Sequence, residues 1–228
     1  MSKGGSGVEF KVNLGDITQF AADALMVNLF EGMEHLSGAT ADVDEALGGI
    51  ISDLISRGEI KGKLNEVTLI HNMGKIPATR VLVVGLGKQE ELTLDKARGA
   101  VAEACRLLQK IKSEKVATVA HVAGVGGIDA ERAAQAIVEG SILGLYSFRE
   151  HMTKEPEFGE IKELLIVQKD QNAPCVLERG SALGKVMAEA TNFARDMVKE
   201  PTNHMTPSNM AELAEKVAHR YGLELTIL

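Results

Sequence analysis

The chain has 228 residues, and its composition limits the classes of protein to which it can belong. Hydrophobic residues make up 45% and charged residues 25%, a balance typical of a globular protein with a sizeable core. The 25 basic and 32 acidic residues give a net charge of −7, which offers no electrostatic reason to bind nucleic acid or an anionic membrane. At this length we expect one large domain, or one domain and part of another.

The cysteines and the first residues indicate a reducing compartment. The chain has two cysteines, Cys105 and Cys175, and they form no CxxC pattern. Cys105 lies in an apolar helical run, where a thiol usually behaves as a small core residue. The opening MSKGGSGVEF lacks the apolar segment of a secretory signal, and no apolar run is long enough to span a bilayer. We therefore expect a cytoplasmic protein without disulfides.

The first half of the chain predicts four strands and one helix. VEFKVNL alternates apolar and polar residues, whereas DALMVNLFEG is an almost continuous apolar run, as in a strand buried on both faces. The opening strands are closely spaced, which would allow antiparallel pairing among them. The predicted strands are 8–14, 23–32, 66–72 and 79–87, and the predicted helix is 41–56. Gly48 and Gly49 weaken this helix, because glycine is a poor helix former.

Strand and helix alternate in the second half. Helices are predicted at 93–111 and 129–148, and strands at 115–122 and 161–168. Asp95 lies in the first turn of its helix, where the helix dipole favours an anion. Such alternation is typical of a mostly parallel sheet with helices on its faces. The predicted fold class is therefore α/β, with a mixed, mostly parallel sheet flanked by helices.

A longer helix is predicted at 181–199. Its apolar residues recur at helical spacing, and they are Leu183, Val186, Ala190, Phe193 and Met197. At ~1.5 Å per residue this helix would be roughly 27 Å long, enough to act as a stiff spacer. Pro201 would end it, because proline cannot continue a helix.

The last predicted elements are one more helix and a strand. Thr206 is a suitable N-cap and Pro207 suits the first helical position, where a missing N–H costs nothing. The helix is expected to run to Tyr221, with Gly222 as its stop signal. LELTIL, at 223–228, reads as a strand with no evident partner in the earlier segments. It is expected to be the first strand of a second sheet.

No catalytic or metal-binding residue is predicted from the side chains. The six histidines are His35, His71, His121, His151, His204 and His219. None is paired at i, i+4 spacing, and HExxH motifs and Cys/His clusters are absent from the sequence. No serine lies in GxSxG, and neither cysteine has a recognisable base partner.

Two glycine-rich turns are the candidates for an anion site. VVGLGKQE and VAGVGGID each follow a predicted strand, and backbone N–H groups at such strand ends can hold an anion. Their glycines are Gly85, Gly87, Gly124, Gly126 and Gly127. Neither stretch completes GxGxxG or GxxxxGK[ST], and glycine is also needed wherever a chain turns tightly. The anion site and the purely structural turn both remain open, the second being favoured.

The stretch NFARDMVKEPTNHMTPSNMAE resembles the linker of the leucyl (cytosol) aminopeptidase family, whose pattern is N-x-A-R-D-[LM]-V-x-x-P-x-N-x-[ML]-[TS]-P. The matching residues are Asn192, Ala194, Arg195, Asp196, Met197, Val198, Pro201, Asn203, Met205, Thr206 and Pro207. Weaker resemblance extends through 81–98 and 136–148 and covers essentially the whole chain.

The resemblance implies a domain organisation and a chemistry. Residues 1–175 would be an N-terminal macro-like domain, 176–206 a linker helix and turn, and 207–228 the truncated start of a catalytic domain. The family removes N-terminal residues from peptides with two divalent ions (Mn or Zn), and it typically forms hexamers. Its metal motifs are not found in this sequence, so the metals, the peptide substrate and the reaction would belong to the absent half. The implied partners are that half and further subunits.

A second resemblance supplies an alternative function. LGDITQFAADALMVNLFEG is similar to the start of a macro domain, an ADP-ribose-binding module. The residues that fit are Asp16, Ile17, Thr18, Asp23, Ala24, Val27 and Asn28, whereas 29–31 depart from the pattern. In that family Asp16 would contact adenine, but its expected role here is that of a turn or cap residue. The alternative is therefore an ADP-ribose- or nucleotide-binding module.

Overall fold

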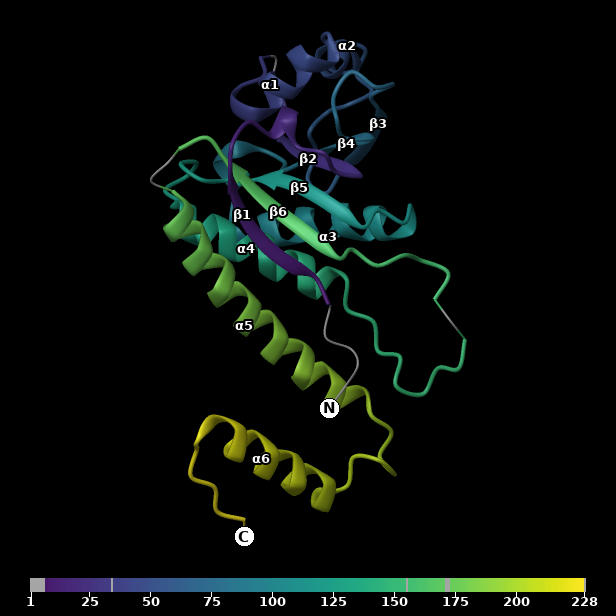
Figure 1. Cartoon of the computed structure of the whole chain (residues 1–228), viewed down its shortest axis with the longest axis vertical. Helices are drawn as coiled ribbons and strands as arrows, with labels where there is room; N and C mark the ends of the chain where they lie inside the picture. The colour runs from purple at the N-terminus through teal and green to yellow at the C-terminus, as the bar shows by residue number, and fades with distance from the viewer. Residues whose placement is uncertain (1–6, 34, 155, 171–172, 228) are drawn as a thin grey trace.

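A six-stranded sheet forms the centre of the molecule, with strand order β1-β6-β5-β2-β4-β3 (Figure 1). The computed structural model describes residues 7–33, 35–154, 156–170 and 173–227. The strands are β1 (Glu9–Leu14), β2 (Ala24–Leu29), β3 (Val67–His71), β4 (Arg80–Gly85), β5 (Lys115–Val119) and β6 (Glu163–Gln168). Two short 3-10 helices, η1 (Ile17–Gln19) and η2 (Gln89–Glu91), follow β1 and β4.

Strand pairing is parallel throughout this sheet except between β3 and β4. The prediction of a mixed, mostly parallel sheet is therefore confirmed. Antiparallel pairing of the opening strands is found for β3 and β4 but not for β1 and β2, because β1 pairs with β6 and β2 lies between β4 and β5. The burial of the strands explains the separation: β1 is partly exposed and suits a sheet edge, whereas β2 is almost wholly buried and suits the centre.

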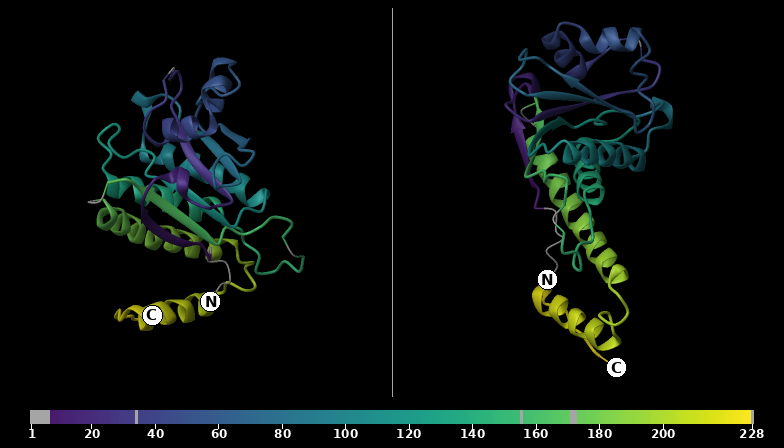
Figure 2. Two further views of the ribbon diagram at one scale, coloured as in Figure 1. Left: turned by 45° about the horizontal axis from the view of Figure 1, so that its top comes forward. Right: turned by 90° about the vertical axis from the view of Figure 1, so that its right-hand side faces the viewer.

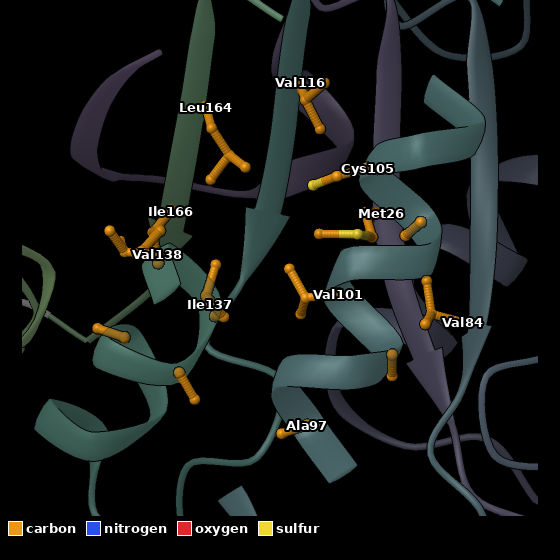
Figure 3. Close-up of a cluster of buried hydrophobic side chains, with 14 of the residues drawn as sticks. Met26, Val84, Ala97, Val101, Cys105, Val116, Ile137, Val138, Leu164 and Ile166 are labelled. Carbon is orange, nitrogen blue, oxygen red and sulfur yellow. The ribbon is translucent and has the colours of Figure 1, made fainter. Parts of the chain in front are cut away.

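Helices cover both faces of the sheet (Figure 2). α1 (Gly38–Leu47) and α2 (Ile50–Ser56) lie on one face, and α3 (Leu94–Lys110) and α4 (Ala130–Gly144) lie on the other. Alternate residues of each strand supply the two cores: Met26 packs in the core with α3 and α4, while Leu25 packs in the core with α1. Figure 3 shows the first of these cores, where Cys105 is buried as predicted. Burial raises the pKa of its thiol to about 11.

The predicted helix at 41–56 is two helices. Gly48 and Gly49 both take left-handed conformations, with φ of 77° and 82°, and divide α1 from α2. Gly49 has no side chain to cap α2, so buried Asp44 of α1 does so, accepting a hydrogen bond from the backbone N–H of Ile51 at 2.7 Å. Single-helix periodicity continues across this break because both helices bury their apolar residues in the same core.

The long helix, α5, runs from Pro174 to Lys199 and so begins earlier than the predicted residue 181. It packs along α4, lying beside β1 (Figure 1). The helix buries small or polar residues: Gly180, Ser181, Gly184, Ala188 and Asn192, together with Leu177. Most of its regularly spaced large apolar residues, which made the helix recognisable, face outward instead.

The last helix, α6 (Pro207–Tyr221), has the predicted caps. Thr206 accepts a hydrogen bond from the N–H of Asn209 at 3.3 Å, and Gly222 is left-handed with φ of 66°. The strand predicted at 223–228 is wrong for its described part, since residues 223–227 form no strand. Strands depend on a hydrogen-bonded neighbour, and none of the described strands lies beside this segment. Among the described helices, none combines the length and apolar character needed to cross a membrane.

Candidate functional site

The candidate site is a crevice at the carboxyl ends of β2 and β5. The chain leaves β2 toward α1 on one face of the sheet and leaves β5 toward α4 on the other, although the two strands are neighbours. In open α/β sheets, ligands bind in the crevice that such a switch of direction creates. A cavity of about 390 Å³ lies at this point. Its lining includes Asn28, Phe30, Ser37, Val119, His121 and Lys169.

A hydrogen-bonded group joins the two strands at the bottom of the crevice. His121 follows β5, and its Nδ1 lies 3.3 Å from Oδ1 of Asn28 at the end of β2. Its Nε2 lies 2.6 Å from Oγ1 of Thr118. Because an amide oxygen only accepts, a neutral ring with its proton on Nδ1 donates to Asn28. Its Nε2 then competes with the backbone oxygen of Met26, 3.1 Å from Oγ1, for the single hydrogen of the Thr118 hydroxyl. Burial lowers the pKa of His121 to about 4, so the imidazole is neutral at pH 7.

The first turn of α1 forms one wall of the crevice. Ser37 is its N-cap, but the serine side chain makes no capping hydrogen bond. Gly38 and Ala39 also line the cavity, so uncapped N–H groups lie beside it. Thr40 holds this turn against the sheet by donating to the backbone oxygen of Asn28 at 2.7 Å. This end of α1 therefore has the positive partial charge that favours an anion.

An ion pair cluster lies at the mouth of the crevice. Lys169 Nζ is 2.8 Å from a carboxylate oxygen of Asp42 and 3.0 Å from one of Asp16. Hydrogen bonds to Asp42 and Asp16 raise the pKa of Lys169. Asp16 also accepts the backbone N–H of Thr18 at 2.9 Å, and this hydrogen bond is the main cause of its lowered pKa. Asp16 thus has the expected role of a cap residue, at η1.

The structure divides the glycines of the candidate anion site into two places. Gly124, Gly126 and Gly127 lie in the loop after β5, all with positive φ, and the neighbouring Ala123 and Val125 line the crevice. Gly85 and Gly87 do not line it. A Cβ atom on Gly85 would overlap the backbone of Lys63, so this glycine lets another part of the chain pack against the end of β4.

Sequence reasoning did not assign roles in a site to Asn28, Ser37, Thr118 or His121. The available signal was weak: Asn28 fits the macro-domain pattern, Thr118 and His121 lie within the predicted strand 115–122, and Ser37 comes shortly after the predicted strand 23–32. Their convergence depends on β2 and β5 being neighbours, which the sequence does not specify. Within the described residues, no group of three or more His, Cys, Asp and Glu side chains is placed to hold a metal ion.

The sheet, its helices and the crevice define an α/β domain of the macrodomain type. A Trypanosoma brucei macrodomain solved in complex with ADP superposes with a TM-score of 0.58 over 75% of this chain and 68% of that chain. The two sequences are 14% identical, so the likeness concerns the fold alone. Macrodomain-like architecture is therefore confirmed for this chain.

The chain belongs to the cytosol aminopeptidase family, because residues 26–155 match the model of the family's N-terminal domain. It is 35% identical over 223 residues to the "Probable cytosol aminopeptidase" of Alkaliphilus metalliredigens, covering 97% of this chain and 44% of the relative. A protein of the same description from Geotalea uraniireducens is 38% identical over 188 residues, covering 82% and 37%. The chain thus spans less than half the length of these relatives.

Two solved structures resemble this chain in fold. A mutant of tomato leucine aminopeptidase matches 94% of this chain and 43% of its own, with a TM-score of 0.77 and 19% identity. The bottromycin maturation enzyme BotP, solved in complex with Mn, matches 90% of this chain and 38% of its own, with a TM-score of 0.66 and 26% identity. The predicted family is confirmed, and residues 26–155 correspond to its N-terminal domain.

Proposed function

We propose that this chain is the non-catalytic assembly module of a cytoplasmic, metal-dependent aminopeptidase. The observation that carries the proposal is the match to the family's N-terminal domain, in a chain spanning 44% of a relative's length. In the parent enzyme, two divalent ions (Mn or Zn) and the peptide substrate would be bound by the other half. The described residues of this chain do not fit a two-metal site, so no reaction step is assigned to them.

The proposed division of the chain is residues 1–175 for the macro-like domain, 176–206 for the linker and 207–228 for the start of the catalytic domain. The independence of α6 supports this division. α6 lies apart from the sheet domain in each view, and Ala218 is its one buried residue within the described chain (Figures 1 and 2). A helix with an amphipathic sequence and so little burial is expected to belong to a different core.

The outer face of α5 is apolar and exposed, which supports the proposal that another part of the same subunit, or another subunit, covers it. Val186 and Val198 are 63% and 85% exposed, and Leu183, Met187 and Phe193 are exposed beside or between them. A stripe of this kind, extending along a helix, is typical of a surface that another protein segment covers. The proposed occupant is the catalytic half that follows α6 in the parent enzyme. Assembly of such subunits into a hexamer is the corresponding proposal for the oligomer.

The proposal predicts that the purified 228-residue protein has no peptidase activity of its own. With Mn²⁺ or Zn²⁺ present, we expect it to leave leucine p-nitroanilide unhydrolysed over hours, because the side chains needed to hold two metal ions would be missing. The release of p-nitroaniline measures the reaction. The full-length relative from Alkaliphilus metalliredigens is the positive control. Metal-dependent turnover by this chain, removed by chelation and restored by metal, would refute the proposal.

A second candidate function is the binding of a nucleotide such as ADP-ribose in the crevice. The observation that favours it is the meeting of a cavity, the uncapped end of α1 and the glycine loop at one switch point. The proposed anion ligands are backbone N–H groups of this turn and of Gly124, Gly126 and Gly127. Asp16 would lie at the mouth of the crevice, where its carboxylate already forms an ion pair with Lys169.

Calorimetric titration tests this second function. Saturable heat with ADP-ribose is expected, with a dissociation constant below about 1 mM, which corresponds to roughly 4 kcal/mol of binding free energy. Ser37→Asp should weaken binding at least tenfold, because its carboxylate would occupy the N–H groups of α1 and repel phosphate. Lys63→Ala, outside the crevice lining, is the control and should bind like the parent chain. Absence of heat at millimolar ADP-ribose would exclude the function.

A further inference from the structure

The last buried contact of α5 is made by residues of the sequence stretch that resembles the family linker. Asn192 is the final buried residue of this helix, and beyond it α5 extends past α4 (Figure 1). Nδ2 of Asn192 donates to the backbone oxygen of Ile142 at 3.4 Å. Nη1 of Arg195 donates to the backbone oxygen of Leu143 at 3.4 Å and to Oδ1 of Asn192 at 3.2 Å.

The two backbone oxygens, of Ile142 and Leu143, belong to the last turn of α4, which ends at Gly144. The last carbonyl groups of a helix have no partner within the helix, and donors from outside stabilise them, positive ones most of all. Asn192 and Arg195 therefore attach α5 to α4 through the terminal carbonyl groups of α4. Hydrogen bonds to the end of α4 fix where α5 lies along α4. They therefore define the direction of α5 more closely than side-by-side packing of the two helices alone.

Tyr146 adds a third attachment just beyond α4. Its hydroxyl donates to Oδ1 of Asp196 at 2.8 Å. Arg195 and Lys199 lie over its ring, with their charged groups 5.5 Å and 4.9 Å from the ring centroid. Cations at such distances are attracted by the face of an aromatic ring. Burial and the bond to Asp196 together raise the pKa of the Tyr146 hydroxyl to about 12, so it remains a donor at neutral pH.

We propose that Asn192, Arg195, Asp196 and Tyr146 form a clamp that fixes the direction in which α5 leaves the sheet domain. The N-terminal half of α5 is held by the close packing of Gly180 and Gly184 on α4. The clamp holds the C-terminal half, together with the contact between Nε2 of His151 and a carboxylate oxygen of Glu200 at 2.8 Å. Without the clamp, the helix could swing about this glycine contact. Arg195 and Asp196 are thus positioning residues. Their use in aiming a catalytic half rests on the proposed function, whereas the clamp itself does not.

The direction of α5 can be measured in the 228-residue protein by electron-electron spin-label distances. Spin labels are attached to cysteines introduced in place of Lys110, at the end of α3, and of Val198, which is 85% exposed. Exposed Cys175 is first replaced by serine, and buried Cys105 is retained because its raised pKa keeps it unreactive. Tyr146→Phe and Asp196→Ala should broaden the distance distribution at least about twofold. Asp196→Asn keeps an acceptor oxygen for the Tyr146 hydroxyl and should leave the distance distribution narrow.

A matched control separates the clamp from general helix stability. Lys185 and Glu189 form an exposed pair on the same helix, so Glu189→Ala should not broaden the distribution. Circular dichroism confirms that each variant is folded, and Tyr146→Phe, which keeps the ring and its cation contacts, is the mildest of them. If Tyr146→Phe and Asp196→Ala both give the parent distribution, the clamp is refuted. Equal broadening by Asp196→Asn and Asp196→Ala would also refute it.

Discussion

Gly180→Leu is expected to lower the free energy of unfolding by about 3 kcal/mol or more. A Cβ atom at Gly180 would overlap the backbone oxygen of Glu131 in α4, and the rest of a leucine side chain cannot avoid the same helix. Overpacking of a filled core typically costs about 1–3 kcal/mol, and the obstacle here is backbone, which cannot turn aside. Urea unfolding followed by circular dichroism measures the change.

Ala182→Leu is the matched control for this prediction. Ala182 lies two residues further along α5 and is exposed, so the same side chain meets solvent there. Its expected effect is within about 0.5 kcal/mol, as for most surface substitutions. An equally stable Gly180→Leu protein would show that α4 and α5 are not packed through their glycines.

His121 is expected to make the protein less stable as pH falls from 6.5 toward 4. Burial lowers its pKa in the folded protein to about 4 from an ordinary 6.5. In this range the unfolded chain binds a proton at this residue and the folded chain does not, so acid favours unfolding. At ~1.36 kcal/mol per pKa unit, the loss over the whole window is about 3 kcal/mol. Above pH 6.5 the contribution is constant.

Comparison with His121→Gln isolates this contribution. The variant lacks the titrating ring, so its unfolding free energy should fall less between pH 7 and pH 4 than that of the parent, by about 3 kcal/mol. His219→Gln, at an exposed position of α6, should retain the parent's pH dependence. Parallel pH profiles for the parent and His121→Gln would contradict the prediction. The imidazole shifts in NMR spectra give the pKa directly.

Local signals predicted most of the elements correctly. The boundary residues Thr206, Pro207 and Gly222 define α6 through backbone chemistry that acts within a few residues. The almost continuous apolar run of β2 indicated a strand buried on both faces for a similar reason, because Asn28 is its only polar residue. Where the cause of structure lies within a short stretch of chain, its sequence is enough to identify the element.

Long-range features were harder to predict. The pairing of β1 with β6 rests mainly on backbone hydrogen bonds, and the one ion pair between them, Lys11 with Glu163 at 2.6 Å, is too small a signal to identify the partner strand from the sequence. The crevice depends on the same unknown, because Asn28 and His121 meet only when β2 and β5 are neighbours. In α5, the apolar periodicity indicated a helix but not its buried face. The spacing of Gly180, Gly184 and Ala188 was the signal for that face.

The pairing of β1 with β6 also has a consequence for the order of events during synthesis. Glu9 lies opposite Glu163, so β1 has no neighbour in the sheet until more than a hundred further residues have been translated. The central strands can associate earlier, which leaves β1 as the final addition at the edge. During this delay β1 is open to chaperones and to mispairing, and α5 is the next element to be made after β6 completes the sheet.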